Sequence, residues 1–87
     1  MKPVDFNIII FQEDDLYTGD CPEFGLYACA DTPEQVKEML IKEARSFVNE
    51  AEKAGNLKDI LDEAGYRLRD GRWTPPKLVS CGIGSAG

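Results

Sequence analysis

The chain has 87 residues, of which sixteen are acidic and ten are basic, and its formal net charge at pH 7 is −6. This length predicts one small domain, residues 1–87, with a modest hydrophobic core. The acidic balance disfavours DNA, because a phosphate backbone is bound mainly by lysine and arginine. It favours a basic protein partner, although an acidic surface that only keeps the protein soluble explains the charge equally well.

Histidine and cysteine usage limits the chemistry further. The sequence contains no histidine, so neither an imidazole metal site nor a Cys–His or Ser–His catalytic dyad can form. Cys21, Cys29 and Cys81 are far apart and follow no secretory segment, which predicts three buried, reduced thiols and a cytoplasmic location. We therefore expect no enzyme activity, no metal and no cofactor. The longest apolar run, residues 8–11, is too short to cross a membrane.

Residues 4–12 predict the first strand, because apolar side chains recur at every second position. The intervening positions add apolar residues to the other face, which predicts a central strand that is covered on both sides. The helix would cover one face, and a partner or the last segment of the chain would cover the other. The first face carries Val4, Phe6, Ile8 and Ile10, and the second carries Ile9 and Phe11.

Two further strands, residues 16–20 and 26–30, complete a predicted antiparallel meander. Between them, Pro22 interrupts the ladder because it has no N–H to donate, and Gly25 permits a tight return. Carboxylates gather around the two turns and could bind a divalent cation through oxygen, but solvation of the turns explains them more simply. These carboxylates are Glu13, Asp14, Asp15, Asp20 and Glu23.

A long helix is predicted to start at Pro33 and to end at Gly55. Thr32 and Gln35 form a capping box around Pro33, and Gly55 suits the left-handed residue that ends a helix. Asn56 is predicted to cap a second, short helix that Gly65 ends. The apolar stripe of the long helix predicts packing on the sheet and contains Val36, Met39, Leu40, Ala44, Phe47, Val48 and Ala51.

Asp70-Gly71 predicts a two-residue hairpin turn that places Leu68 opposite Trp73. Alternation then gathers arginines on the other face of the hairpin, where they either contact RNA or are solvated on an exposed sheet face and form salt bridges with the acidic face of the long helix. These are Arg67, Arg69 and Arg72. A last strand is predicted beside the first at Leu78, Val79, Cys81 and Ile83, and residues 82–87 are predicted to fray.

The segment from Tyr17 to Glu34 resembles the core of the HicB-like antitoxin family. The matching residues are Tyr17, Pro22, Glu23, Phe24, Gly25, Thr32 and Glu34. The family pattern continues with Leu-Pro-Gly after the glutamate, whereas this chain has only Phe24-Gly25. Ala30 also replaces a family glycine.

The resemblance implies an α+β, partial ribonuclease-H-like fold: a three-stranded antiparallel meander, a long helix, a short helix with a hairpin, and a final strand. It implies an antitoxin that binds and masks a small basic toxin of the HicA type, which cleaves mRNA. Asp5 lies where a nuclease of this fold would carry a carboxylate, but no partner carboxylates can be named, so nuclease activity is disfavoured.

The segment after Trp73 is too short for a DNA-binding module of the family. One alternative is an orphan HicB-like domain that has no toxin and acts as a regulatory adaptor through self-association, as a homodimer or higher homo-oligomer. The other is RNA binding through the arginine-rich hairpin. The predicted partner-binding residues are Pro22, Glu23 and Phe24 in the corner, and Arg67, Arg69, Arg72 and Trp73 in the hairpin.

Overall fold

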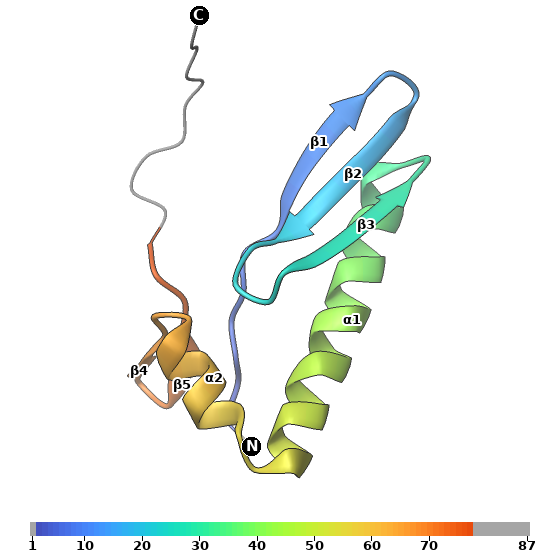
Figure 1. The fold of residues 1–87 in the computed structure, drawn as a ribbon. Helices are drawn as coiled ribbons and strands as arrows, with labels where there is room; N and C mark the ends of the chain where they lie inside the picture. Colours follow the sequence, from blue (N-terminus) through green and yellow to red (C-terminus); the bar gives the residue numbers. More distant parts are fainter. Residues whose placement is uncertain (1, 78–87) are drawn as a thin grey trace, which may run out of the picture.

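A computed structural model describes residues 2–77 and confirms the α+β fold (Figure 1). Strands β1 (Ile9–Glu13), β2 (Leu16–Cys21) and β3 (Leu26–Ala30) form an antiparallel sheet in the order β1-β2-β3. The helices α1 (Pro33–Ala54) and α2 (Leu57–Glu63) follow, and then the hairpin of β4 (Arg67–Arg69) and β5 (Arg72–Thr74). The predicted last strand at Leu78 to Ile83 and the tail at 82–87 lie outside the described residues.

Helix α1 packs against one face of the sheet, and the closest approach is at Gly19 in the central strand. A Cβ atom built on Gly19 would lie 2.4 Å from Val36 Cγ1 and 2.9 Å from Leu40 Cδ1. Val36 and Leu40 have no exposed surface and form the core together with Cys21 and Ala28. The missing side chain at Gly19 is therefore what lets the helix come this close to the sheet.

The ends of α1 and most of its apolar stripe are as predicted. Thr32 Oγ1 accepts a hydrogen bond from Gln35 N at 3.2 Å, and Gly55 has a φ of 78°. Met39 is the exception in the stripe, because 41% of it is exposed. Among residues 2–77 no strand lies beyond β3, so Met39 lies in a shallow groove beside Leu26 rather than under the sheet. The buried positions of α1 are Val36, Leu40, Ala44, Val48 and Ala51.

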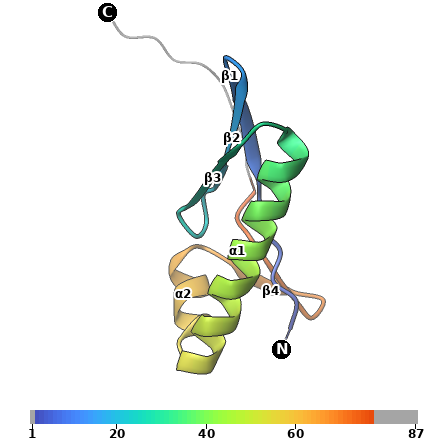
Figure 2. The ribbon, with the colours of Figure 1, turned by 90° about the vertical axis from the view of Figure 1, so that its right-hand side faces the viewer.

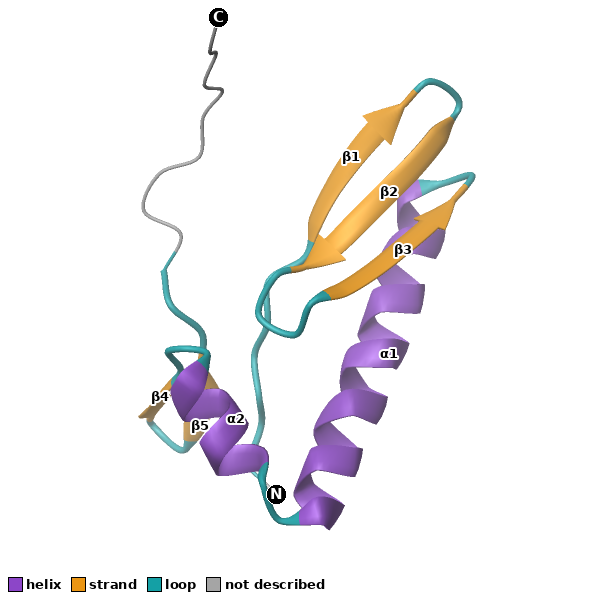
Figure 3. Cartoon of the chain, viewed as in Figure 1, coloured by secondary structure: helices purple, strands orange, loops and turns teal. Residues whose placement is uncertain are grey.

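The prediction of one central strand over residues 4–12 was wrong, because this segment is divided between two sheets. Its second half is β1, which is an edge strand of the sheet within residues 2–77. Its first half runs parallel to β5: Trp73 N donates to Pro3 O at 2.8 Å, and Asp5 N donates to Trp73 O at 2.9 Å. The N-terminal segment thus links the meander to the hairpin, which lies at the other end of the molecule (Figure 3).

Helix α2 starts after Asn56 and packs beside the C-terminal half of α1 (Figure 2). The Asn56 side chain makes no capping bond, and its main-chain oxygen accepts from Ile60 N at 3.1 Å instead. Leu61 is fully buried, and Gly65, with a φ of 86°, turns the chain toward the hairpin. In the part of the chain that the structure describes, no helix has both the length and the apolarity that a membrane span requires.

Candidate functional site

The corner between β2 and β3 binds the N-terminal segment through Glu23. Glu23 Oε1 accepts hydrogen bonds from both the main-chain N and the side-chain Nδ2 of Asn7, each at 2.8 Å. The other oxygen, Oε2, is buried and has no hydrogen-bond partner among the described residues. The Glu23 carboxylate is thus engaged in hydrogen bonds within the chain, and these bonds fix the position of Asn7.

Phe24 also points into the molecule. Its ring stacks on Phe47 of α1 with a centroid distance of 4.8 Å, and on Tyr66 at 6.0 Å with an interplanar angle of 5°. Phe6 of the N-terminal segment approaches the same ring at 6.2 Å. Of the three corner residues predicted to bind a partner, only Pro22 is exposed. The corner is therefore mainly the place where distant parts of the chain meet.

The hairpin has the predicted turn and register. Asp70 and Gly71 have φ values of 50° and 78°, and Leu68 lies opposite Trp73. Positive φ at both turn residues is the signature of the type I′ turn, which is why an Asp-Gly pair identifies the hairpin from sequence.

Arg72 is held by a carboxylate, although not by one of α1 as the sequence suggested. Its Nη2 lies 2.6 Å from Asp5 Oδ1 and its Nε donates to Asp5 Oδ2 at 3.2 Å, so the pair is bidentate. This hydrogen bonding, together with the charge of the guanidinium, lowers the pKa of Asp5. The predicted salt bridge with α1 was wrong, because the pairing of β5 with residues 3–5 places the carboxylate of Asp5 beside Arg72.

The remaining hairpin residues divide into internal and exposed ones. Trp73 is half-buried and hydrogen-bonded through its backbone, and Tyr66 is buried and donates from its hydroxyl to Asp5 O at 2.7 Å. Burial, followed by the charge of Glu23, raises the pKa of Tyr66. Arg67 and Arg69 are exposed and form no ion pair within residues 2–77. Two arginines, rather than three, are available for a ligand on this face.

The two described cysteines differ in their surroundings, and both are free thiols. Cys21 has no exposed surface, and burial, together with the charge of Glu23, raises its pKa to about 11. Cys29 is exposed, so the prediction of a buried thiol was wrong there, because nothing among residues 2–77 covers that face of the sheet. Cys81 lies outside the described residues.

The sequence reasoning missed the surface around Cys29, which we call the outer face: Phe11, Leu16, Thr18, Tyr27 and Cys29, on the side of the sheet opposite α1. In the strand register, Thr18 lies between Phe11 and Cys29. Thr18 is buried by these neighbours, whereas Phe11 is 49% and Tyr27 61% exposed. The signal was present in the alternation of residues 27 and 29 with the buried Ala28. It was overlooked because β1 was expected to be covered on both faces.

These residues offer contact surfaces rather than a reaction centre. Among the described residues, no three histidine, cysteine or acidic side chains come together in a way that could hold a metal ion. The acidic turn residues Glu13, Asp14 and Asp15 are exposed at the end of the β1–β2 hairpin, next to the outer face. Comparison of the chain with protein-family models, curated proteins and solved structures found no match.

Proposed function

We propose that this chain is a protein-binding module of the HicB-like antitoxin kind, which binds and masks a small basic toxin of the HicA type in the cytoplasm. The observation that carries this proposal is the outer face. An exposed apolar surface with a charged margin is typical of a protein–protein interface. Here the aromatic rings of Phe11 and Tyr27 are exposed, and Glu13 to Asp15 provide a negative margin.

Electrostatics favour the outer face over the hairpin as the toxin-binding surface. A basic toxin would be attracted by the acidic turn, and attraction of this kind mainly raises the rate of association. Arg67 and Arg69 would repel the same partner from the hairpin. Since Glu23 and Phe24 are engaged internally, we expect the corner to contribute to binding through Pro22 alone.

Co-purification with any small basic protein that is encoded beside this gene tests the proposal. The wild-type chain should retain the partner, and the double variant Phe11→Ser with Tyr27→Ser should lose it. The matched control is Met39→Ser with Leu68→Ser, which removes two exposed apolar side chains elsewhere and should leave binding intact. The antitoxin proposal fails if no neighbouring basic protein binds, or if both pairs of substitutions weaken binding equally.

A homodimer is the second candidate, and the edge position of β1 favours it. An edge strand offers unpaired main-chain groups to a second copy, and within residues 2–77 no strand lies on the outer side of β1. Sedimentation velocity of the pure protein would distinguish the two. A dimer that Phe11→Ser dissociates, together with no binding of a basic partner, would favour self-association.

RNA binding through the hairpin is the third alternative, in which Arg67 and Arg69 are the hairpin arginines without an ion pair to a described residue. It predicts binding of a single-stranded RNA that weakens steeply as salt rises. A titration at low salt in which no complex forms would end this alternative.

A further inference from the structure

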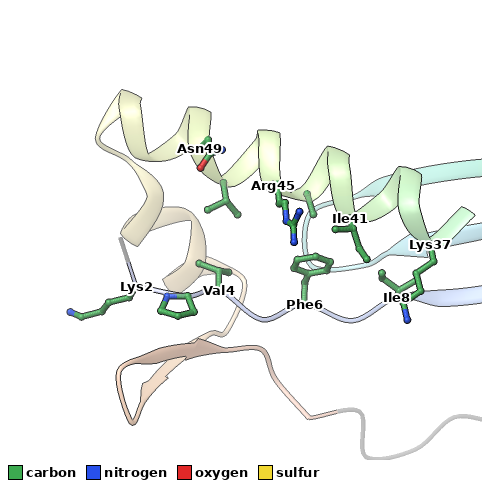
Figure 4. Close-up of a pocket in the computed structure, with 11 residues that line it drawn as sticks. Lys2, Val4, Phe6, Ile8, Lys37, Ile41, Arg45 and Asn49 are labelled. Carbon is green, nitrogen blue, oxygen red and sulfur yellow. The ribbon is translucent and has the colours of Figure 1, made fainter. Parts of the chain in front are cut away.

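A groove with an apolar floor and a basic margin lies between α1 and the N-terminal segment, away from the outer face (Figure 4). We call it the α1 groove. Its volume is about 660 Å³, which is within the range of about 300–1,000 Å³ that is usual for small-molecule sites. The helix contributes Lys37, Ile41 and Arg45, and the segment contributes Val4, Phe6 and Ile8.

The residues that line the groove recur with a different spacing in the helix and in the N-terminal segment. On α1 the lining residues recur every four positions and so share one side of the helix, whereas on the extended segment they recur every two. Figure 4 shows Phe6 and Ile8 pointing toward the helix and Ile41 pointing toward the segment. All three are only half-buried, so the floor is apolar surface that a ligand could still cover.

The charged margin is entirely basic. Lys37 and Arg45 are eight residues apart on α1, which places their backbones about 12 Å apart along the helix. Neither forms an ion pair with any described residue, and no acidic residue lines the groove. Asp5, the carboxylate of the segment, pairs with Arg72 of the hairpin instead. A protein with a net charge of −6 thus has an all-basic margin beside exposed apolar surface.

We propose that the α1 groove binds an amphipathic anion, namely a molecule with an alkyl chain and a carboxylate headgroup. The alkyl chain would cover Phe6, Ile8 and Ile41, and the carboxylate would bind the guanidinium of Arg45, which suits two-point recognition of a carboxylate. Lys37, beside Ile8 at one end of the groove, and Lys2 at the opposite end would add longer-range attraction for the anion. This site is separate from the outer face and does not depend on the antitoxin proposal.

Calorimetric titration of the full chain with dodecanoate, below its micellar concentration, tests this site. One molecule should bind per chain, and the double variant Lys37→Glu with Arg45→Glu should weaken binding by about tenfold or more. The matched control, Lys42→Glu with Lys53→Glu, makes the same change in net charge on the same helix but outside the groove, and should bind as the wild type does. Dodecyltrimethylammonium, with the same alkyl chain and a cationic head, should bind at least tenfold more weakly.

A second measurement keeps the test independent of the stability of the variants. In NMR spectra of the wild-type chain, dodecanoate should shift the amide signals of Phe6, Ile8 and Ile41 before those of Phe11 and Tyr27. The proposal is overturned if the outer-face signals shift first, if both variant pairs lose affinity equally, or if the cationic probe binds as well as dodecanoate. It is also overturned if dodecanoate does not bind. If, in that case, Lys37→Glu with Arg45→Glu dissociates a dimer, the groove holds a second copy of the chain.

Discussion

Two regions of this molecule are held together by different forces. In the sheet–helix region, β1 to β3 pack on α1 through side chains with no exposed surface, such as Val36 and Leu40. In the hairpin region, residues 3–5 contact β5 and Tyr66 through main-chain hydrogen bonds, one hydroxyl and an ion pair that is exposed to solvent. Stability in this chain should therefore depend on packing in the first region and on individual polar bonds in the second.

The largest loss is expected from Leu40→Ala. Leu40 is fully buried between α1 and the sheet, and removal of such a side chain costs about 2–5 kcal/mol, which is a large part of the roughly 4–13 kcal/mol expected for a chain of this length. Urea unfolding followed by circular dichroism measures the loss. Met39→Ala, on the exposed margin of the same helix, is the control and should cost far less.

Gly19→Ala tests the packing of the same region from the side of the sheet. The new Cβ would lie 2.4 Å from Val36 Cγ1, so the Val36 side chain or the helix must shift, and overpacking of this kind costs about 1–3 kcal/mol. Val36→Ala should restore part of the stability when it is combined with Gly19→Ala, because it makes room for the added methyl group. If the effects of the two substitutions simply add, the close approach at Gly19 is not what limits the packing.

A smaller loss is expected in the hairpin region from Tyr66→Phe. The substitution keeps the ring that stacks on Phe24 and removes only the hydroxyl that donates to Asp5 O, which is worth about 1 kcal/mol. Hydrogen exchange should show faster opening at the amides of Asp5 and Trp73, with little change at Gly19. Equal acceleration at all three amides would mean that the two regions open as one unit, and the comparison would fail.

The smallest effect is expected from Arg72→Gln, because the ion pair with Asp5 is exposed. Arg72 lowers the pKa of Asp5, so the pair stabilises the fold above the unfolded pKa of about 3.9, and this contribution is lost as the pH falls through the lower, folded value. In the variant, the pKa of Asp5 should rise toward its ordinary value in a carboxyl NMR titration. The difference in melting temperature between variant and wild type should shrink on acidification from pH 7 to pH 3.

The sequence predicted the elements of both regions better than the contact that joins them, because the determinants of the elements are local. Thr32 and Gly55 fix the ends of α1 from neighbouring residues, and Asp70-Gly71 fixes the hairpin register in the same way. By contrast, the parallel pairing of Val4 with Trp73 has no local signature, so residues 4–12 read as one strand.

For the candidate site too, local features were predicted from the sequence, and features that depend on distant residues were not. Pro22, Glu23 and Phe24 were identified as a corner, but the inward direction of Glu23 and Phe24 depends on Asn7, Phe47 and Tyr66, which are distant in sequence. The alternation along β3 indicated which residues form the outer face, but their exposure depends on the absence of a covering element among residues 2–77. Periodicity assigns residues to a face of a strand, whereas exposure depends on which elements cover that face.

The division of the N-terminal segment between two sheets also has a consequence for the order of folding. The meander and α1 join neighbouring parts of the chain, whereas the bond from Trp73 N to Pro3 O closes a loop of nearly the whole described chain. Contacts of such long sequence separation form slowly, because their loop entropy must be paid before they are made. During synthesis, residues 3–5 emerge first and can pair only after β5 has left the ribosome. We therefore expect the meander and α1 to form early, and docking of the hairpin onto the N-terminal segment to be the last step of folding.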